Sequence, residues 1–141
     1  MRARSHMKEV FTELDTFVDD PEMRTRADAI ITRLILKYGP PFDFGRNRLV
    51  FANDHIVFKF PRNHAGMADN DWEGSCSAPY LARGKWLEID GFICVMQERV
   101  QRLYADAICP KKLPDWVGSI DCCQVGYDRQ GKLRAYDFGR N

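Results

Sequence analysis

The stretch HIVFKF at residues 55–60 follows the stretch RLVFA at residues 48–52 with only a short polar break between them. Both stretches are rich in β-branched and aromatic residues, which suit the pleated, half-buried surface of a β-strand. The break at residues 53–54 consists of Asn and Asp, a pair that is typical of a tight turn. The sequence therefore predicts an antiparallel hairpin here.

Lys59, in the second strand, bears on whether that strand lies at the edge or inside the sheet. Because side chains alternate along a strand, Val57 and Lys59 share one face, and the aromatic residues share the other. Lys59 admits two interpretations. It either protects an edge strand against aggregation or points inward and meets an anion, since an unpaired buried ammonium is costly. In the second case Glu73, on the next predicted helix, is the natural partner.

The chain before the hairpin is predicted to be helical. Residues 8–18 place their apolar side chains on one helical stripe. A second helix is expected to begin after Asp20, with proline at its first position, and to end at residues 39–41 (GPP). Residues 8–38 thus form a helical segment.

Beyond the hairpin, short helices and further hairpins are expected to alternate. In order, the sequence predicts a loop at 61–70, a short helix at 71–83 that carries Trp72 and Glu73, a hairpin at 85–89 and 92–98, a helix at 100–108, a connector at 109–114, and a hairpin at 124–127 and 132–136. Turn residues between the paired strands indicate both hairpins. Helices that alternate with hairpins favour an α+β domain on an antiparallel sheet.

The chain is long enough for one domain and its core. It has 141 residues and a net charge of +1. Residues 1–7 look like cloning residue, so we take residues 8–141 as a single domain whose sheet-rich core is residues 45–141. The stretch DFGRN occurs at 43–47 and again at 137–141, but no longer period accompanies it, so it is not a structural repeat.

Composition excludes several classes of protein. A nearly neutral chain argues against a nucleic-acid binder that acts through a broad basic face. No apolar run approaches the length of a membrane span, and no signal peptide opens the chain. The 5 cysteines show no CxxC spacing, which argues against a zinc site and favours reduced thiols in a cytoplasm.

Several stretches together resemble the protein kinase-like superfamily, and in particular small kinase-like proteins encoded by bacteriophages. Residues 56–59 (IVFK) resemble the kinase strand with the nucleotide-binding lysine, and Glu73 falls where the helix glutamate would pair with it. Residues 93–100 resemble the strand that leads through a gatekeeper residue, here Met96, into the hinge. Residues 124–139 resemble the hairpin that ends in the metal-binding Asp-Phe-Gly. The resemblance implies a kinase amino-terminal lobe that ends at this hairpin, without a helical carboxy-terminal lobe.

The resemblance also implies a site for Mg-ATP. It places Lys59, Glu73, Gly45, Met96 and Glu98 around the nucleotide, and the following pair at the magnesium ion: Asp137 and Gln124.

Glycine is scarce where a kinase has its phosphate-binding loop. The first Asp-Phe-Gly falls at that point and supplies only Gly45. Arg46 and Arg48 could supply charge there instead, although arginines that flank a strand are more often solvated.

The catalytic residues depart most from the kinase pattern. Counting along the chain, Ser119 stands where the catalytic aspartate belongs, and serine does not accept a proton as a carboxylate does. Asp121 or Asp115 could take the place of the catalytic aspartate only if the catalytic loop has a different conformation from that of a kinase. The chain stops two residues beyond Gly139, so an activation loop and an acceptor-binding lobe are not expected.

Three hypotheses about function follow. The first is a catalytically impaired, kinase-like bacteriophage protein that binds and modulates a host protein, as a monomer or homodimer, through a face formed by Val100, Trp116 and Phe138. The second is a Mg-ATP-dependent phosphotransferase or nucleotide-hydrolysing enzyme. The third is a nucleotide-dependent switch, which needs binding alone.

Overall fold

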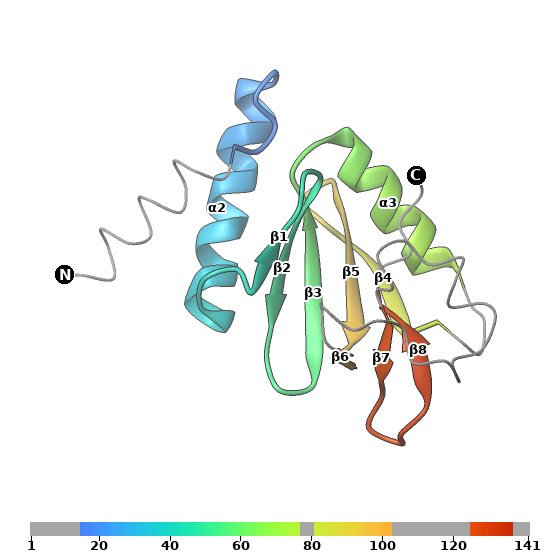
Figure 1. Ribbon diagram of the computed structural model, residues 1–141. Coiled ribbons are helices and arrows are strands. Elements are labelled where there is room, and N and C mark those ends of the chain that lie inside the picture. Colours follow the sequence, from blue (N-terminus) through green and yellow to red (C-terminus); the bar gives the residue numbers. More distant parts are fainter. Residues whose placement is uncertain (1–14, 77–80, 103–124, 137–141) are drawn as a thin grey trace.

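The computed structural model describes residues 15–76, 81–102 and 125–136, and the structural statements below concern these ranges. They form an α+β fold of two helices and two antiparallel sheets (Figure 1). The elements are α2 (Pro21–Tyr38), β1 (Asp43–Phe44), β2 (Arg48–Ala52), β3 (Ile56–Pro61), α3 (His64–Ser75), β4 (Gly84–Ile89), β5 (Phe92–Glu98), β6 (Gln101–Arg102), β7 (Val125–Tyr127) and β8 (Leu133–Ala135).

The larger sheet has five strands in the order β1-β2-β3-β5-β4, and the smaller has three in the order β6-β7-β8. The predicted hairpins β2–β3, β4–β5 and β7–β8 are all confirmed. β3 is a central strand, and Lys59 lies between Val50 of β2 and Val95 of β5. The interpretation of Lys59 as a guard on an edge strand is therefore wrong.

The predicted second helix is confirmed as α2. Asp20 caps it, because its carboxylate accepts a hydrogen bond from the Met23 amide at 3.1 Å, and Pro21 occupies the first helical position. Gly39 ends it with a φ of 86°, a conformation that other residues rarely adopt.

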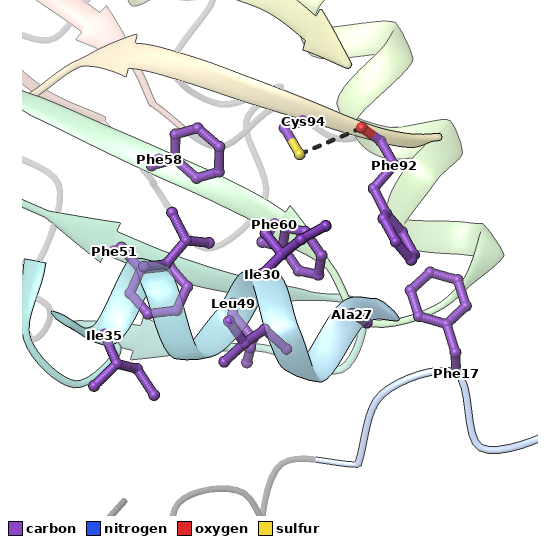
Figure 2. Close-up of a cluster of buried hydrophobic side chains, with 12 residues drawn as sticks. Phe17, Ala27, Ile30, Ile35, Leu49, Phe51, Phe58, Phe60, Phe92 and Cys94 are labelled. Carbon is purple, nitrogen blue, oxygen red and sulfur yellow. Dashed lines mark hydrogen bonds between the residues drawn. The ribbon is translucent and has the colours of Figure 1, made fainter. Parts of the chain in front are cut away.

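One face of the larger sheet packs against α2 and forms the apolar core (Figures 1 and 2). The buried cluster contains Phe17, Ala27, Ile30, Ile31, Leu34, Ile35, Leu49, Phe51, Phe58, Phe60, Phe92 and Cys94. The two strands of the first hairpin contribute alternate residues to it, as a period of two requires. In Figure 2 the aromatic rings of the sheet point toward α2.

Helix α3 crosses the opposite face of the same sheet, where Glu73 reaches Lys59 and Gly74 lies against Trp86. A Cβ atom at Gly74 would come within 2.7 Å of the Trp86 Cβ, so only glycine permits this approach. Asn63 caps the helix by accepting a hydrogen bond from the Gly66 amide at 2.8 Å.

Three expected boundaries are wrong. Helix α3 begins at His64 within the expected loop and ends at Ser75, because the cap at Asn63 outweighs a sequence poor in helix-forming residues. Residues 15–18 are not helical, and residues 8–14 lie outside the described ranges.

The third concerns the helix expected at 100–108. Gln101–Arg102 form strand β6, which pairs with β7, and residues 103–108 lie outside the described ranges. Neither helix in the described part of the chain is long and apolar enough to cross a membrane.

Candidate functional site

A cavity of about 460 Å³ lies beside the face of the larger sheet that is turned away from α2, between this sheet and the β6–β7 end of the smaller one. Its described lining residues are Phe42, Asp43, Val50, Asp54, Val57, Lys59, Gln97, Glu98, Arg99, Val100, Gln101, Tyr127, Asp128, Arg129 and Tyr136. Valines and tyrosines supply apolar walls, and seven of the fifteen described lining residues are charged, four of them acidic and three basic. Sites for small molecules combine apolar walls with polar groups in this way.

A buried ion pair stands at the wall of this cavity. The Lys59 Nζ atom lies 2.8 Å from the Glu73 Oε1 atom, and only 3% of Lys59 and 1% of Glu73 is exposed. Lys59 also donates a hydrogen bond of 2.6 Å to the carbonyl of Tyr136. The predicted contact between strand and helix is thus confirmed, and Lys59 joins both sheets.

Glu73 has a second cationic partner, which the sequence interpretation missed. Arg48, 8% exposed, forms a salt bridge with the other carboxylate oxygen of Glu73 and donates a hydrogen bond of 3.3 Å to Asn70. The expectation that Arg48 is solvated is therefore wrong, whereas Arg46 is exposed. Strand alternation could have found this partner, because Arg48 shares its face of β2 with Val50, the neighbour of Lys59.

The buried ionic cluster of Arg48, Lys59 and Glu73 is held to the sheet by Asn70. Its side-chain amide donates to the carbonyl of Lys59 at 3.3 Å and to that of Ile93 at 2.9 Å. Two cations, Arg48 and Lys59, thus contact the carboxylate of Glu73. Lys59 is the member of the cluster that lines the cavity.

Of the other residues predicted to bind the nucleotide, Glu98 lines the cavity, whereas Met96 and Gly45 do not. Glu98 lines the cavity, and its carboxylate accepts hydrogen bonds from the backbone amide and the guanidinium of Arg83 at 2.8 and 3.3 Å. Met96 packs against the apolar core on the α2 side and is not among the described lining residues. Gly45 is not among them either; its amide donates to the carbonyl of Arg48.

The predicted partner-binding residues and metal ligands are mostly beyond the described ranges. Val100 is described, and it is buried and lines the cavity. The following residues lie outside the described ranges: Asp115, Trp116, Ser119, Asp121, Gln124, Asp137 and Phe138.

The β7–β8 turn at the cavity rim is organised by Asp128. Its carboxylate accepts hydrogen bonds from the amides of Gln130 and Lys132 at 2.8 and 2.9 Å and from the Arg134 guanidinium at 3.0 Å. The hydrogen bond from Lys132 is the main cause of a lowered pKa for Asp128, and Arg134 and Gln130 add to it against the effect of burial. Asp128 therefore acts as a structural anion that secures one wall.

Gln97 is the second residue that the sequence interpretation missed as a site residue. It is 2% exposed and lines the cavity, yet neither atom of its side-chain amide has a hydrogen-bond partner in the described part of the chain. Strand alternation could also have pointed to Gln97, because it lies opposite Val57 and therefore shares a face of the sheet with Lys59.

The fold and the site thus define a small α+β domain with a ligand-sized cavity between two antiparallel sheets and a buried ion pair at its wall. Comparisons with protein-family models, with curated proteins and with solved structures found no match.

Proposed function

We propose that this chain is a minimal, catalytically impaired kinase-like protein that binds a nucleotide in the cavity between its two sheets. The observation that carries this proposal is the Lys59–Glu73 ion pair at the wall of a cavity of about 460 Å³. A kinase-like strand lysine has this role, because its ammonium binds phosphate oxygens while a helix glutamate holds it in place.

The size and the lining of the cavity support a nucleotide. Sites for molecules of this size occupy roughly 300–1,000 Å³ and combine apolar walls with a few polar groups. Val50 and Val57 offer apolar surface, and Tyr127 and Tyr136 offer aromatic rings, for a planar base. Lys59, the cluster residue that lines the cavity, is the cation that would contact the phosphates.

Impaired catalysis rests on the sequence alone. Ser119 stands at the position that the resemblance gives to the catalytic base, and a hydroxyl at neutral pH does not take up a proton from an acceptor. A protein that binds a nucleotide without using it efficiently acts most simply through a partner. We therefore extend the proposal to a bacteriophage protein in the host cytoplasm that binds and modulates a host protein, with Trp116 and Phe138 as the candidate contact residues. Val100 is buried at the cavity wall and is not among them.

The alternative function is Mg-ATP-dependent phosphotransfer or nucleotide hydrolysis. The ion pair of Lys59 and Glu73 favours it, since efficient kinases need the same pair. It further requires that Asp137 and Gln124 bind Mg²⁺ and that Asp121 acts as the base.

The decisive experiment measures thermal unfolding with and without Mg-ATP. A ligand at about 100 times its dissociation constant stabilises the folded protein by about 2.7 kcal/mol, so the wild type should unfold at a clearly higher temperature with Mg-ATP. Lys59→Met should lose most of this shift and still fold, because Arg48 continues to neutralise Glu73. Lys85→Met, at an exposed lysine of β4, is the matched control and should keep the shift.

Two results would overturn parts of this proposal. A wild-type protein that gains no stability from millimolar Mg-ATP does not bind the nucleotide. If the wild type transfers radiolabel from ATP to an acceptor and Asp137→Ala does not, the protein is a phosphotransferase and the proposal of impaired catalysis is wrong.

A further inference from the structure

Strand β4 forms one edge of the larger sheet, and this edge is long and open. Its 6 residues pair with β5 without a bulge or a proline, whereas β1, at the opposite edge, has only 2 residues. The carbonyl of Arg83 accepts a hydrogen bond from the Glu98 amide at 2.8 Å, so the odd-numbered residues of β4 turn their backbone groups toward β5. The backbone groups of Gly84, Trp86 and Glu88 therefore face outward, and no residue in the described part of the chain pairs with them.

The side chains along this edge are accessible. Lys85 and Glu88 are exposed, and 40% of Trp86 is exposed. Trp86 is held in place, because its Nε1 atom donates a hydrogen bond of 3.0 Å to the Asp71 carboxylate and its Cβ atom lies against Gly74. A row of unpaired backbone groups beside a fixed aromatic ring is suited to accept an added strand.

Alternation distributes the charges of this edge over the two faces of β4. Lys85 shares one face with Leu87 and Ile89, which pack against the apolar core. Trp86 and Glu88 share the face toward α3. In an antiparallel pair of strands, directly opposite residues lie on the same face and their side chains interact. A complementary strand therefore carries an acidic residue opposite Lys85, a basic residue opposite Glu88 and apolar residues between them.

A second copy of this chain does not supply these charges. Two β4 strands can meet edge to edge in antiparallel order only if both sheets turn the same face forward, so odd-numbered residues lie opposite odd-numbered ones. The odd-numbered residues from Arg83 to Ile89 include no acid, so Lys85 would find no anion. Charge complementarity thus favours a chain of different sequence as the occupant of this edge.

We propose that the β4 edge is a binding site for an extended segment of a partner protein, which adds to the sheet as an antiparallel strand. In its own amino-to-carboxyl direction the segment has the pattern basic, apolar, apolar, acidic, opposite residues 88 to 85. Its main-chain hydrogen bonds give affinity and its two charges give specificity, while the same charges on β4 discourage pairing with unmatched strands. The inference goes beyond the proposed function, since it requires neither a nucleotide nor the contact residues named there.

The test uses the hexapeptide TRVYET, designed to lie opposite residues 89 to 84, and its charge-exchanged counterpart TEVYRT. Nuclear magnetic resonance titration of the isotope-labelled protein gives both dissociation constants. The backbone amide signals of Gly84, Trp86 and Glu88 should shift on binding. Wild type should bind TRVYET about tenfold more tightly than TEVYRT, because two attractive cross-strand pairs become two repulsive ones in the counterpart.

Two double variants assign this preference to the edge. Lys85→Glu combined with Glu88→Lys exchanges the charges of β4 and should reverse the preference, so that TEVYRT binds more tightly. Asp19→Lys combined with Arg33→Glu exchanges two charges at exposed positions before and within α2, and this matched control should keep the preference of the wild type.

A second readout tests strand addition itself. Methylation of the backbone nitrogen of the tyrosine in TRVYET, which lies opposite Trp86, removes a hydrogen bond to the edge and should abolish binding. Methylation of the backbone nitrogen of the neighbouring valine, opposite Leu87, affects a group that points away from β4 and should be tolerated.

Several results would overturn this inference: equal affinity of wild type for the two peptides, equal effects of the two methylations, or no binding at millimolar peptide. If the wild type dimerises and TRVYET dissociates the dimer, the occupant is a second copy and the proposal is wrong. The samples contain no nucleotide, so a failure here is distinct from a failure of nucleotide binding.

Discussion

The two faces of the five-stranded sheet are built on different physical grounds. The face under α2 carries the buried apolar cluster, which includes Phe51 and Phe60 with fully buried side chains. The face under α3 and the smaller sheet contains Lys59, Gln97 and a buried glutamate from α3. Apolar burial is favourable without regard to direction, whereas buried charges are tolerated only when they are paired. The first face therefore supplies the apolar core, and the second contains the buried ion pair and borders the cavity.

The two helices reflect the same contrast. α2 has a regular apolar stripe, with Ile30, Ile31 and Leu34 turned toward the sheet. α3 has no comparable stripe; its buried residues include Asn70 and Glu73, which bond to the sheet through polar atoms. A helix of the second kind has no apolar periodicity, which explains why the sequence predicts a loop over its first half.

The largest expected effect lies on the apolar face. Phe60→Ala should lower the free energy of unfolding by about 4 kcal/mol, because it removes a buried ring and leaves a cavity beside Phe92, whose ring centroid lies 5.3 Å away. Chemical denaturation measures this loss. Phe60→Leu should lose less, since this face requires volume and not a particular group.

The control for this substitution is Leu36→Ala on the exposed side of α2, which should change stability little. If Phe60→Ala were as mild as Leu36→Ala, the apolar face would not be the source of stability.

The second effect tests the requirement for charge on the opposite face. Glu73→Gln keeps the shape of the side chain but removes the carboxylate charge that Lys59 and Arg48 contact, so it should lower the free energy of unfolding by about 3 kcal/mol. Glu88→Gln, at an exposed glutamate of β4, is the matched control and should change it by less than about 0.5 kcal/mol. Tolerance of Glu73→Gln would mean that shape governs both faces alike.

The smallest effect concerns a titratable group within the apolar face. Burial raises the pKa of the Cys94 thiol to about 12, whereas the thiol of the unfolded chain ionises near 9.0. The folded state therefore holds its proton more tightly, and this share of stability is present below pH 9.0 and is lost as the pH rises toward 12.

Urea denaturation at about pH 8 and about pH 10 should show the loss as about 1 kcal/mol more in wild type than in Cys94→Val. Identical losses in the two proteins would show that the folded state does not hold the Cys94 proton more tightly than the unfolded chain.

Local sequence determined much of this protein. The period of two in residues 48–60, the cap at Asp20 and the turn at Asp90-Gly91 predicted the hairpins and α2 correctly, because each signal acts between residues close in the chain. The pairing of Lys59 with Glu73 also followed, since a buried ammonium needs an anion and few were near.

Only the tertiary structure decided the remainder of the site. Arg48 joins the ion pair, Gln97 lies at the cavity wall, and Met96 packs against the apolar core, because the register between β2, β3 and β5 sets which residues share a face. The register of β3 against β5 joins residues forty apart in the chain, such as Val57 and Gln97, and alternation within one strand does not encode it. The sequence thus determined α2, the three hairpins and one ion pair, and the packing of the two sheets formed the cavity at whose wall that pair lies.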